Sequence, residues 1–271
     1  MAPAARLSRP KHLLVLVYWG GAALLLPWIV LLYFEQAPRG LAHRIHLIGV
    51  GVSVLMIAGM VATAVWCRHN SHFTVVAGVF TATVAFVTAW FATVTSTGGR
   101  FDEVFIYVPV VQLPVAVLCA WTVRRLYRPH GAHAAPPARV PLVLMVAAVI
   151  VVPVVAVIAG VAPSVAAAHH LRIVWVGLDV FELIGMAATG WCLRRSLPSV
   201  AVAGALTGSL LFCDAWFDVV PTTGRVEVEG ILMALVELPL AALSFLIAFR
   251  EVAGWPEASP RPPALRRRRG Y

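Results

Sequence analysis

Hydrophobic residues in this chain occur in long, nearly uninterrupted runs separated by short polar segments. A bilayer core about 30 Å thick needs about 20 apolar residues per helix. Eight runs of about this length span residues 13–34, 45–66, 73–94, 105–123, 140–161, 173–193, 200–220 and 231–249. Backbone groups in lipid must find hydrogen-bond partners within their own segment, as a helix allows. The pattern therefore predicts an all-α integral membrane protein with eight transmembrane helices.

The number and placement of the charged residues indicate a membrane protein rather than a nucleic-acid-binding protein. They make up 12% of the chain, against roughly 25% in soluble domains, so the composition is that of a membrane protein. A net charge of +9 would suggest nucleic acid in a soluble domain. Here the basic residues lie between apolar runs, as the positive-inside rule predicts. We expect membrane lipids, and no nucleic acid, as partners.

The basic residues also predict the orientation in the membrane. With both termini in the cytoplasm, 16 of the 21 basic residues lie on the cytoplasmic side and 5 on the other. This bias predicts a multi-pass protein of the bacterial inner membrane with cytoplasmic termini. The tail, residues 251–271, is expected to be disordered. Its Arg266, Arg267, Arg268 and Arg269 are expected to attract anionic lipid headgroups.

The two halves of the chain are similar in sequence. Between 43–98 and 169–224, offset by 126 positions without gaps, 20 of 56 residues are identical. At an offset of 125, VQLP at 111–114 matches VELP at 236–239. We therefore expect a four-helix repeat over 1–123, a cytoplasmic linker over 124–139 and a second repeat over 140–250. An even number of spans per repeat makes the two repeats parallel, related by an axis along the membrane normal.

Ionisable residues inside the predicted spans are the candidates for function. Five acids of the second half lie there, namely Asp179, Glu182, Asp214, Asp218 and Glu237. The first two are spaced i,i+3 and the next two i,i+4, so each pair shares a helix face. A rise of 1.5 Å per residue puts Asp179, Asp214 and Glu237 each roughly 9 Å below the outer helix end. The matching residues of the first half are polar but uncharged, namely Ser53, Thr88 and Gln112.

Carboxylates inside a membrane are costly unless they are paired, hydrated or protonated, and neighbouring carboxylates oppose each other's ionisation. We therefore hypothesise that the five acids form a cation or proton site of a coupled transporter or an ion-binding protein. One alternative is a membrane sensor or scaffold in which the acids only form interhelical hydrogen bonds and Asp218 faces water. Another is a lipid-modifying enzyme with a carboxylate metal site. The sequence has no nucleophile elbow, HExxH motif or P-loop, and we assign no catalytic residue or cofactor.

Two short motifs carry the available resemblances. The DAWFD stretch at 214–218 has the DxxxD spacing of CDP-alcohol phosphotransferases, but Leu183 stands where that family has glycine, and Asp214 lies too far from Asp179. UbiA-type prenyltransferases have two Asp-rich motifs facing the cytoplasm, and the first half here has none. With VGLD at 176–179 and DAWFD, the chain loosely resembles multi-span membrane proteins of high-GC bacteria. That resemblance implies a membrane protein and no particular activity.

Overall fold

The computed structural model describes residues 9–34, 41–69, 71–95, 108–127, 139–161, 166–220 and 225–254. Apart from short turns these residues are helical, and they include no strand, which confirms the predicted all-α class. The helices are α1 (Arg9–Phe34), α2 (Leu41–Arg68), α3 (Phe73–Thr95), the π-helical turn η1 (Val108–Gln112) with α5 (Leu113–Leu126), α6 (Arg139–Val161), α7 (Ala166–Arg194), α8 (Val200–Val219) and α9 (Arg225–Ala253).

Several helices are long and apolar enough to cross a membrane. Within the described residues there are five such segments, namely Leu47–Arg68, Phe73–Val94, Ile173–Arg194, Val200–Val219 and Gly230–Ala253. At 1.5 Å per residue, each is about 30 Å long or more, which matches a bilayer core. Helices α1 and α6 contain shorter apolar stretches, His12–Pro27 and Arg139–Pro153. These helices fit a polytopic membrane protein.

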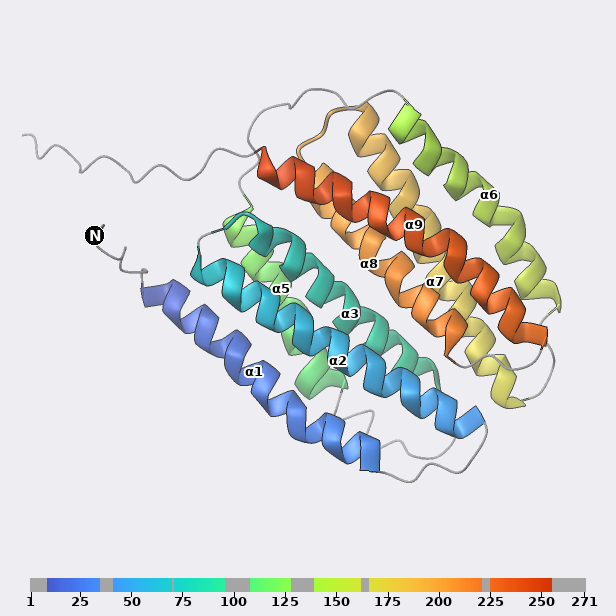
Figure 1. Ribbon diagram of the computed structural model, residues 1–271, viewed down its shortest axis with the longest axis horizontal. Helices are drawn as coiled ribbons and strands as arrows, with labels where there is room; N and C mark the ends of the chain where they lie inside the picture. The colour runs from blue at the N-terminus through green and yellow to red at the C-terminus, as the bar shows by residue number, and fades with distance from the viewer. Residues whose placement is uncertain are drawn as a thin grey trace, which may run out of the picture.

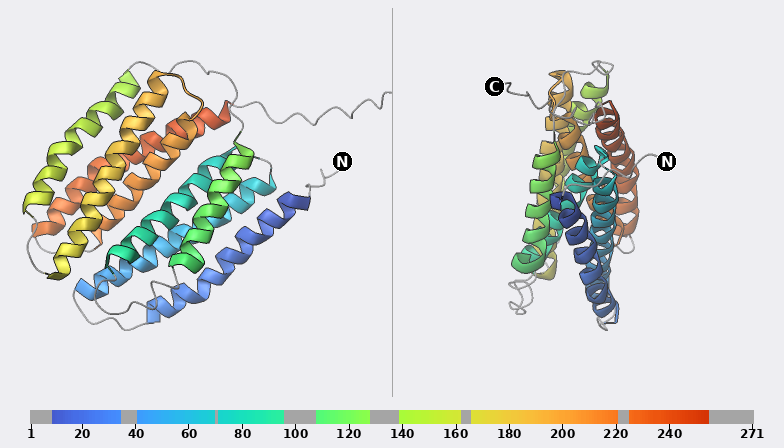
Figure 2. Two further views of the ribbon diagram at one scale, coloured as in Figure 1. Left: turned by 180° about the vertical axis from the view of Figure 1, so that it is seen from behind. Right: turned by 90° about the vertical axis from the view of Figure 1, so that its left-hand side faces the viewer.

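The helices form two groups of four that lie side by side. Figure 1 shows α1, α2, α3 and α5 on one side and α6, α7, α8 and α9 on the other. Helices α3 and α8 make the main contact between the groups, and α3 also contacts α7 and α9. Helices α1 and α6 lie at opposite outer edges (Figure 2). Helix α8 therefore lies at the centre of the molecule, and its Asp214 is buried.

Two glycines allow close reciprocal contacts between the groups. A Cβ atom added to Gly51 of α2 would lie 2.4 Å from Cζ2 of Trp216 in α8. A Cβ atom added to Gly177 of α7 would lie 2.8 Å from Cζ2 of Trp90 in α3. Each indole therefore occupies space that only glycine leaves open. The two pairs have the same residue types and are separated by 126 positions in both members.

Other contacts within each group occur in the same pairs. The Thr63 and Thr81 hydroxyls join α2 to α3 at 3.4 Å, and the Thr189 and Thr207 hydroxyls join α7 to α8 at 2.9 Å. The turns after α2 and α7 are also alike. Their Ser71 and Leu197 amides donate to the carbonyls of Trp66 and Cys192, five residues earlier, at 2.9 and 2.8 Å. In the second turn Ser196 has φ 50°, as in a Schellman helix cap.

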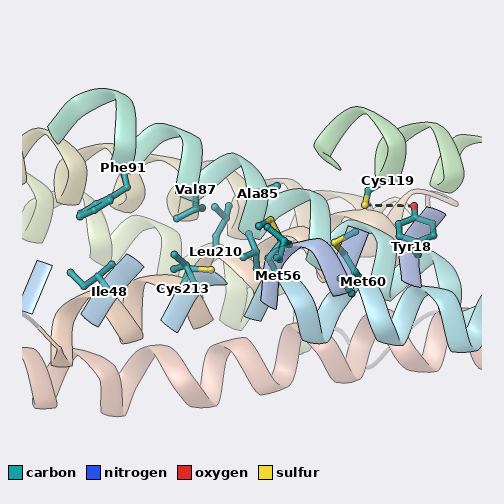
Figure 3. Close-up of a cluster of buried hydrophobic side chains, with 14 of the residues drawn as sticks. Tyr18, Ile48, Met56, Met60, Ala85, Val87, Phe91, Cys119, Leu210 and Cys213 are labelled. Atoms are coloured by element: carbon teal, nitrogen blue, oxygen red, sulfur yellow. Dashed lines mark hydrogen bonds between the residues drawn. The ribbon is translucent and has the colours of Figure 1, made fainter. Parts of the chain in front are cut away.

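The largest buried apolar cluster includes residues of both groups. Figure 3 shows Met56, Met60, Val87 and Phe91 of the first group together with Leu210 and Cys213 of the second. The Phe91 and Phe217 rings lie 5.1 Å apart between centroids. Helices α8 and α9 approach through small residues, because Gly204 and Gly208 of α8 face Ser244, Ala248 and Ala241 of α9. Small residues let helix backbones approach closely in membrane proteins.

Some predicted boundaries differ from the observed ones. Helices α7 and α9 begin at Ala166 and Arg225, several residues before the predicted spans at 173 and 231, because polar residues extend each helix beyond its apolar run. The predicted linker begins at 124, whereas α5 continues to Leu126. Most of that linker, at 128–138, and the arginine tail with Arg266–Arg269 lie outside the described residues.

Candidate functional site

Three carboxyl groups from two helices meet in the interior of the second group. Asp179 and Glu182 come from α7, and Asp214 comes from α8. One carboxylate oxygen from each lies within 4.8 Å of those of the other two. The side chains are 4%, 2% and 2% exposed, respectively. We call these three residues the carboxylate cluster.

The pairing of α7 with α8 explains why these acids meet. A Cβ atom at Gly185 would lie 2.8 Å from the Thr207 hydroxyl oxygen, so these residues face each other in the two helices. The two helices are joined by a short turn and run antiparallel. The step from Gly185 back to Asp179 in α7 therefore runs in the same direction as the step from Thr207 forward to Asp214 in α8, and it brings the two acids to the same level. Both distances along the helix are about 10 Å at 1.5 Å per residue. Glu182 follows Asp179 by three residues and shares its face.

Glu237 and Asp218 lie beside the cluster. Glu237 of α9 is 4% exposed, and its charge acts on both Glu182 and Asp214. Asp218 is half-buried and also acts on both residues. From their depths along the helices, the sequence predicted that Asp179, Asp214 and Glu237 meet. In the structure, the residue whose carboxylate oxygen lies within 4.8 Å of those of Asp179 and Asp214 is Glu182. The depth argument used only the rise along each helix and ignored the direction in which a side chain points.

The buried carboxyl groups lack partners for several of their oxygens. Asp179 Oδ2, Glu182 Oε1, Asp214 Oδ1 and Glu237 Oε2 are buried and accept no hydrogen bond from any described residue. The Glu182 and Asp214 carboxyls lie beside each other, and a hydrogen bond between them would require a proton on one of the two. The charged groups that act on these two residues within the described chain are all carboxyls. Buried polar atoms nearly always have partners, so these oxygens point to a proton, a cation or water.

The geometry is compatible with either a bound cation or shared protons. Oxygen ligands lie 2.0–2.1 Å from Mg²⁺ and 2.3–2.6 Å from Ca²⁺. Two oxygens on opposite sides of such an ion are therefore separated by at most roughly 5 Å, and the cluster's oxygens lie within 4.8 Å of one another. Protons on one or two of the carboxyls would also reduce the buried negative charge. The cluster can thus hold positive charge in either form.

The matching positions of the first group carry no charge. Ser53 and Thr88 are buried, and their hydroxyls donate to the carbonyls of Gly49 and Val84 at 2.8 and 2.6 Å. Met56, which matches Glu182 at the offset of 126, lies in the apolar cluster of Figure 3. Gln112, which matches Glu237, is fully buried, and neither its Oε1 nor its Nε2 has a partner among the described residues. The sequence placed Gln112 inside the predicted span 105–123, and in the structure it is the last residue of η1, directly before α5.

Comparisons of the chain with protein-family models, curated proteins and solved structures find no match. The interpretation of the carboxylate cluster therefore rests on its own geometry. The predicted transmembrane acids are Asp179, Glu182, Asp214, Asp218 and Glu237. Four of these five are buried, and the fifth, Asp218, is half-buried.

Proposed function

We propose that this protein is a polytopic membrane protein that binds a cation or a proton at Asp179, Glu182 and Asp214, with Glu237 and Asp218 beside them. Its role would be cation- or proton-coupled transport, or ion binding. The observation that carries the proposal is the meeting of three buried carboxyls within 4.8 Å, with unpartnered oxygens and no basic group among the described charges that act on Glu182 and Asp214. Such an arrangement is strongly unfavourable in low dielectric without added positive charge.

The proposal includes eight spans arranged as two parallel four-helix repeats. The reciprocal pairs Gly51–Trp216 and Gly177–Trp90 support this arrangement. In a two-fold interface, residue i contacts j of the partner and j contacts i, and these pairs follow that rule at an offset of 126. Phe91 and Phe217 match each other at the same offset, and their rings are in contact. A residue next to a two-fold axis contacts its own counterpart in this way.

The orientation and location in the cell follow from the basic residues. The 16 to 5 distribution of basic residues supports cytoplasmic termini in a bacterial inner membrane. In that orientation the carboxylate cluster lies in the outer half of the membrane. An ion would then have a shorter path to the cluster from the outer side of the membrane than from the cytoplasm.

The chain itself offers a neutral version of the site for the test. The triple variant Asp179→Ser, Glu182→Met, Asp214→Thr installs the residues of the first group at the matching positions. Asp214→Asn is a milder change, because asparagine keeps the size and hydrogen-bonding capacity of the side chain. Glu251→Gln is the matched control, since Glu251 is an acid of the second group near the end of α9, outside the cluster.

The proteins would be purified, placed in liposomes and assayed for proton flux with an enclosed pH-sensitive dye. Binding of Mn²⁺, a paramagnetic probe that accepts carboxylate ligands, would be measured by electron paramagnetic resonance. We expect Asp214→Asn and the triple variant to fold and to lose the ion signal of the wild type, and Glu251→Gln to keep it. If Asp214→Asn keeps every binding and flux signal, or if the wild type has none, the ion-site proposal fails. Loss of folding in Asp214→Leu but not in Asp214→Asn would then support the structural alternative.

A further inference from the structure

An apolar groove lies between the two groups, and none of its lining residues belongs to the carboxylate cluster. It has a volume of about 330 Å³ and is lined by α3, α5 and α8, with Phe86, Ala120 and Leu206 among its residues. This volume is at the lower end of the range for small-molecule pockets, about 300 to 1,000 Å³. At one end of the groove lie Arg124 and Tyr127, the only charged and phenolic side chains of its lining.

The corresponding position on the other side of the α3–α8 contact, next to α9, is occupied by side chains of the protein. The two places correspond because Gly78 of α3 faces Cys119 and Val123 of α5, as Gly204 of α8 faces Ser244 and Ala248 of α9. At the resulting offset of 125, Phe245 matches Ala120 and Phe249 matches Arg124.

The aromatic rings fill that second place closely. The rings of Phe80 and Phe245 lie 6.1 Å apart, and those of Phe245 and Phe249 lie 6.4 Å apart. Phe80 matches Leu206 at the offset of 126. The groove therefore exists because Ala120, Arg124 and Leu206 stand where the other side has three phenylalanines.

The charged end of the groove indicates the chemistry of its occupant. Arg124 is exposed and forms no ion pair or hydrogen bond with another described residue. Tyr127 donates its hydroxyl to the carbonyl of Pro198, which lies in the turn before α8. Burial, with smaller effects of Glu251 and Cys192, raises the pKa of Tyr127, so its hydroxyl remains a neutral donor. Among the described residues, Arg124 is thus an unpaired positive charge next to an apolar surface.

We propose that this groove binds one acyl chain of an acidic phospholipid, with the lipid phosphate on the Arg124 guanidinium. Charged and apolar parts of the lipid then match the two ends of the groove. Arginine binds phosphate through several N–H donors in a planar group. The bound lipid replaces, on this side of the interface, the packing that Phe245 and Phe249 provide on the other. This site does not depend on the carboxylate cluster.

Native mass spectrometry of the full chain, released from nanodiscs of phosphatidylglycerol and phosphatidylcholine, tests this proposal. We expect the wild type to retain phosphatidylglycerol with about a fivefold preference, the effect of one basic residue near the membrane surface. Arg124→Gln should abolish the preference. Ala120→Phe and Leu206→Phe, which copy the filled side, should reduce retention of both lipids. Arg125→Gln is the control, because Arg125 lies over the Trp121 ring and does not line the groove.

Ala120→Phe and Leu206→Phe are two independent variants that fill the groove, so the test remains decisive if one of them fails to fold. Circular dichroism establishes whether each variant folds. The proposal is overturned if a folded filling variant retains phosphatidylglycerol as the wild type does. It is equally overturned if Arg125→Gln removes the preference as fully as Arg124→Gln, which would indicate general surface attraction. Equal retention of the two lipids by the wild type would also overturn it.

Discussion

The reciprocal contacts between glycine and tryptophan give a sharp prediction about how the two groups of helices associate. Gly51→Ala would place a Cβ atom 2.4 Å from the Trp216 ring, and Gly177→Ala would place one 2.8 Å from the Trp90 ring. Both distances are below ordinary van der Waals contact, so the ring or the helix must move.

The expected magnitude follows from two opposing effects. Overpacking typically costs 1–3 kcal/mol, and replacing glycine by alanine inside a helix returns roughly 0.5–1 kcal/mol. We therefore expect each glycine variant to lose about 1–2 kcal/mol of unfolding free energy. Removing the facing ring should remove the clash. Gly51→Ala should thus couple to Trp216→Ala, and Gly177→Ala to Trp90→Ala, by about 1–2 kcal/mol.

Unfolding in mixed micelles with increasing denaturing detergent, followed by circular dichroism, would measure these free energies for the single and double variants. The crossed combinations, Gly51→Ala with Trp90→Ala and Gly177→Ala with Trp216→Ala, serve as controls and should be additive within about 0.5 kcal/mol. Equal coupling in matched and crossed pairs, or no coupling in the matched pairs, would refute the reciprocal contact.

Further predictions concern helix packing and topology. Gly204→Ala should lower the melting temperature, because its Cβ atom would lie 2.9 Å from the Ser244 carbonyl oxygen, whereas Gly20→Ala should not, since nothing lies within 4 Å of that position. Tyr18→Phe should cost about 0.5–1.5 kcal/mol of unfolding free energy, measured as above, because it removes the 2.8 Å hydrogen bond to Thr122. Reporters placed at the C-terminal end and between α8 and α9 should report opposite sides of the membrane, and the same side would contradict the predicted topology.

The helices could be predicted from the sequence because each consists of a long apolar run, and lipid leaves the backbone few alternatives to a helix. The pattern was least informative at the ends of the runs. There α7 and α9 continue through His, Arg and Glu residues that a hydropathy argument assigns to loops. It also gave no indication of the π-helical turn η1, which comes just before Pro114.

The sequence identified the members of the candidate site but not their arrangement. Helical periodicity placed Glu182 on the same helix face as Asp179. The depth estimate, however, predicted Glu237 rather than Glu182 as the neighbour of Asp179 and Asp214. Which carboxyls approach most closely depends on the register between α7 and α8, which is fixed by the contact of Gly185 with Thr207. The groove at Ala120 and Arg124 depends on how α5 and α8 pack against α3 on either side of it. No single-helix pattern contains that information.

The central claim is that the carboxylate cluster holds a proton or a cation. Infrared difference spectroscopy of the protein in liposomes measures this directly through the C=O stretch of protonated carboxyl groups. For the wild type near neutral pH we predict a protonated-carboxyl band that weakens when Mn²⁺ is added and that is absent or displaced in Asp214→Asn. A wild type that shows neither a protonated carboxyl at neutral pH nor any carboxylate response to Mn²⁺ would contradict the account.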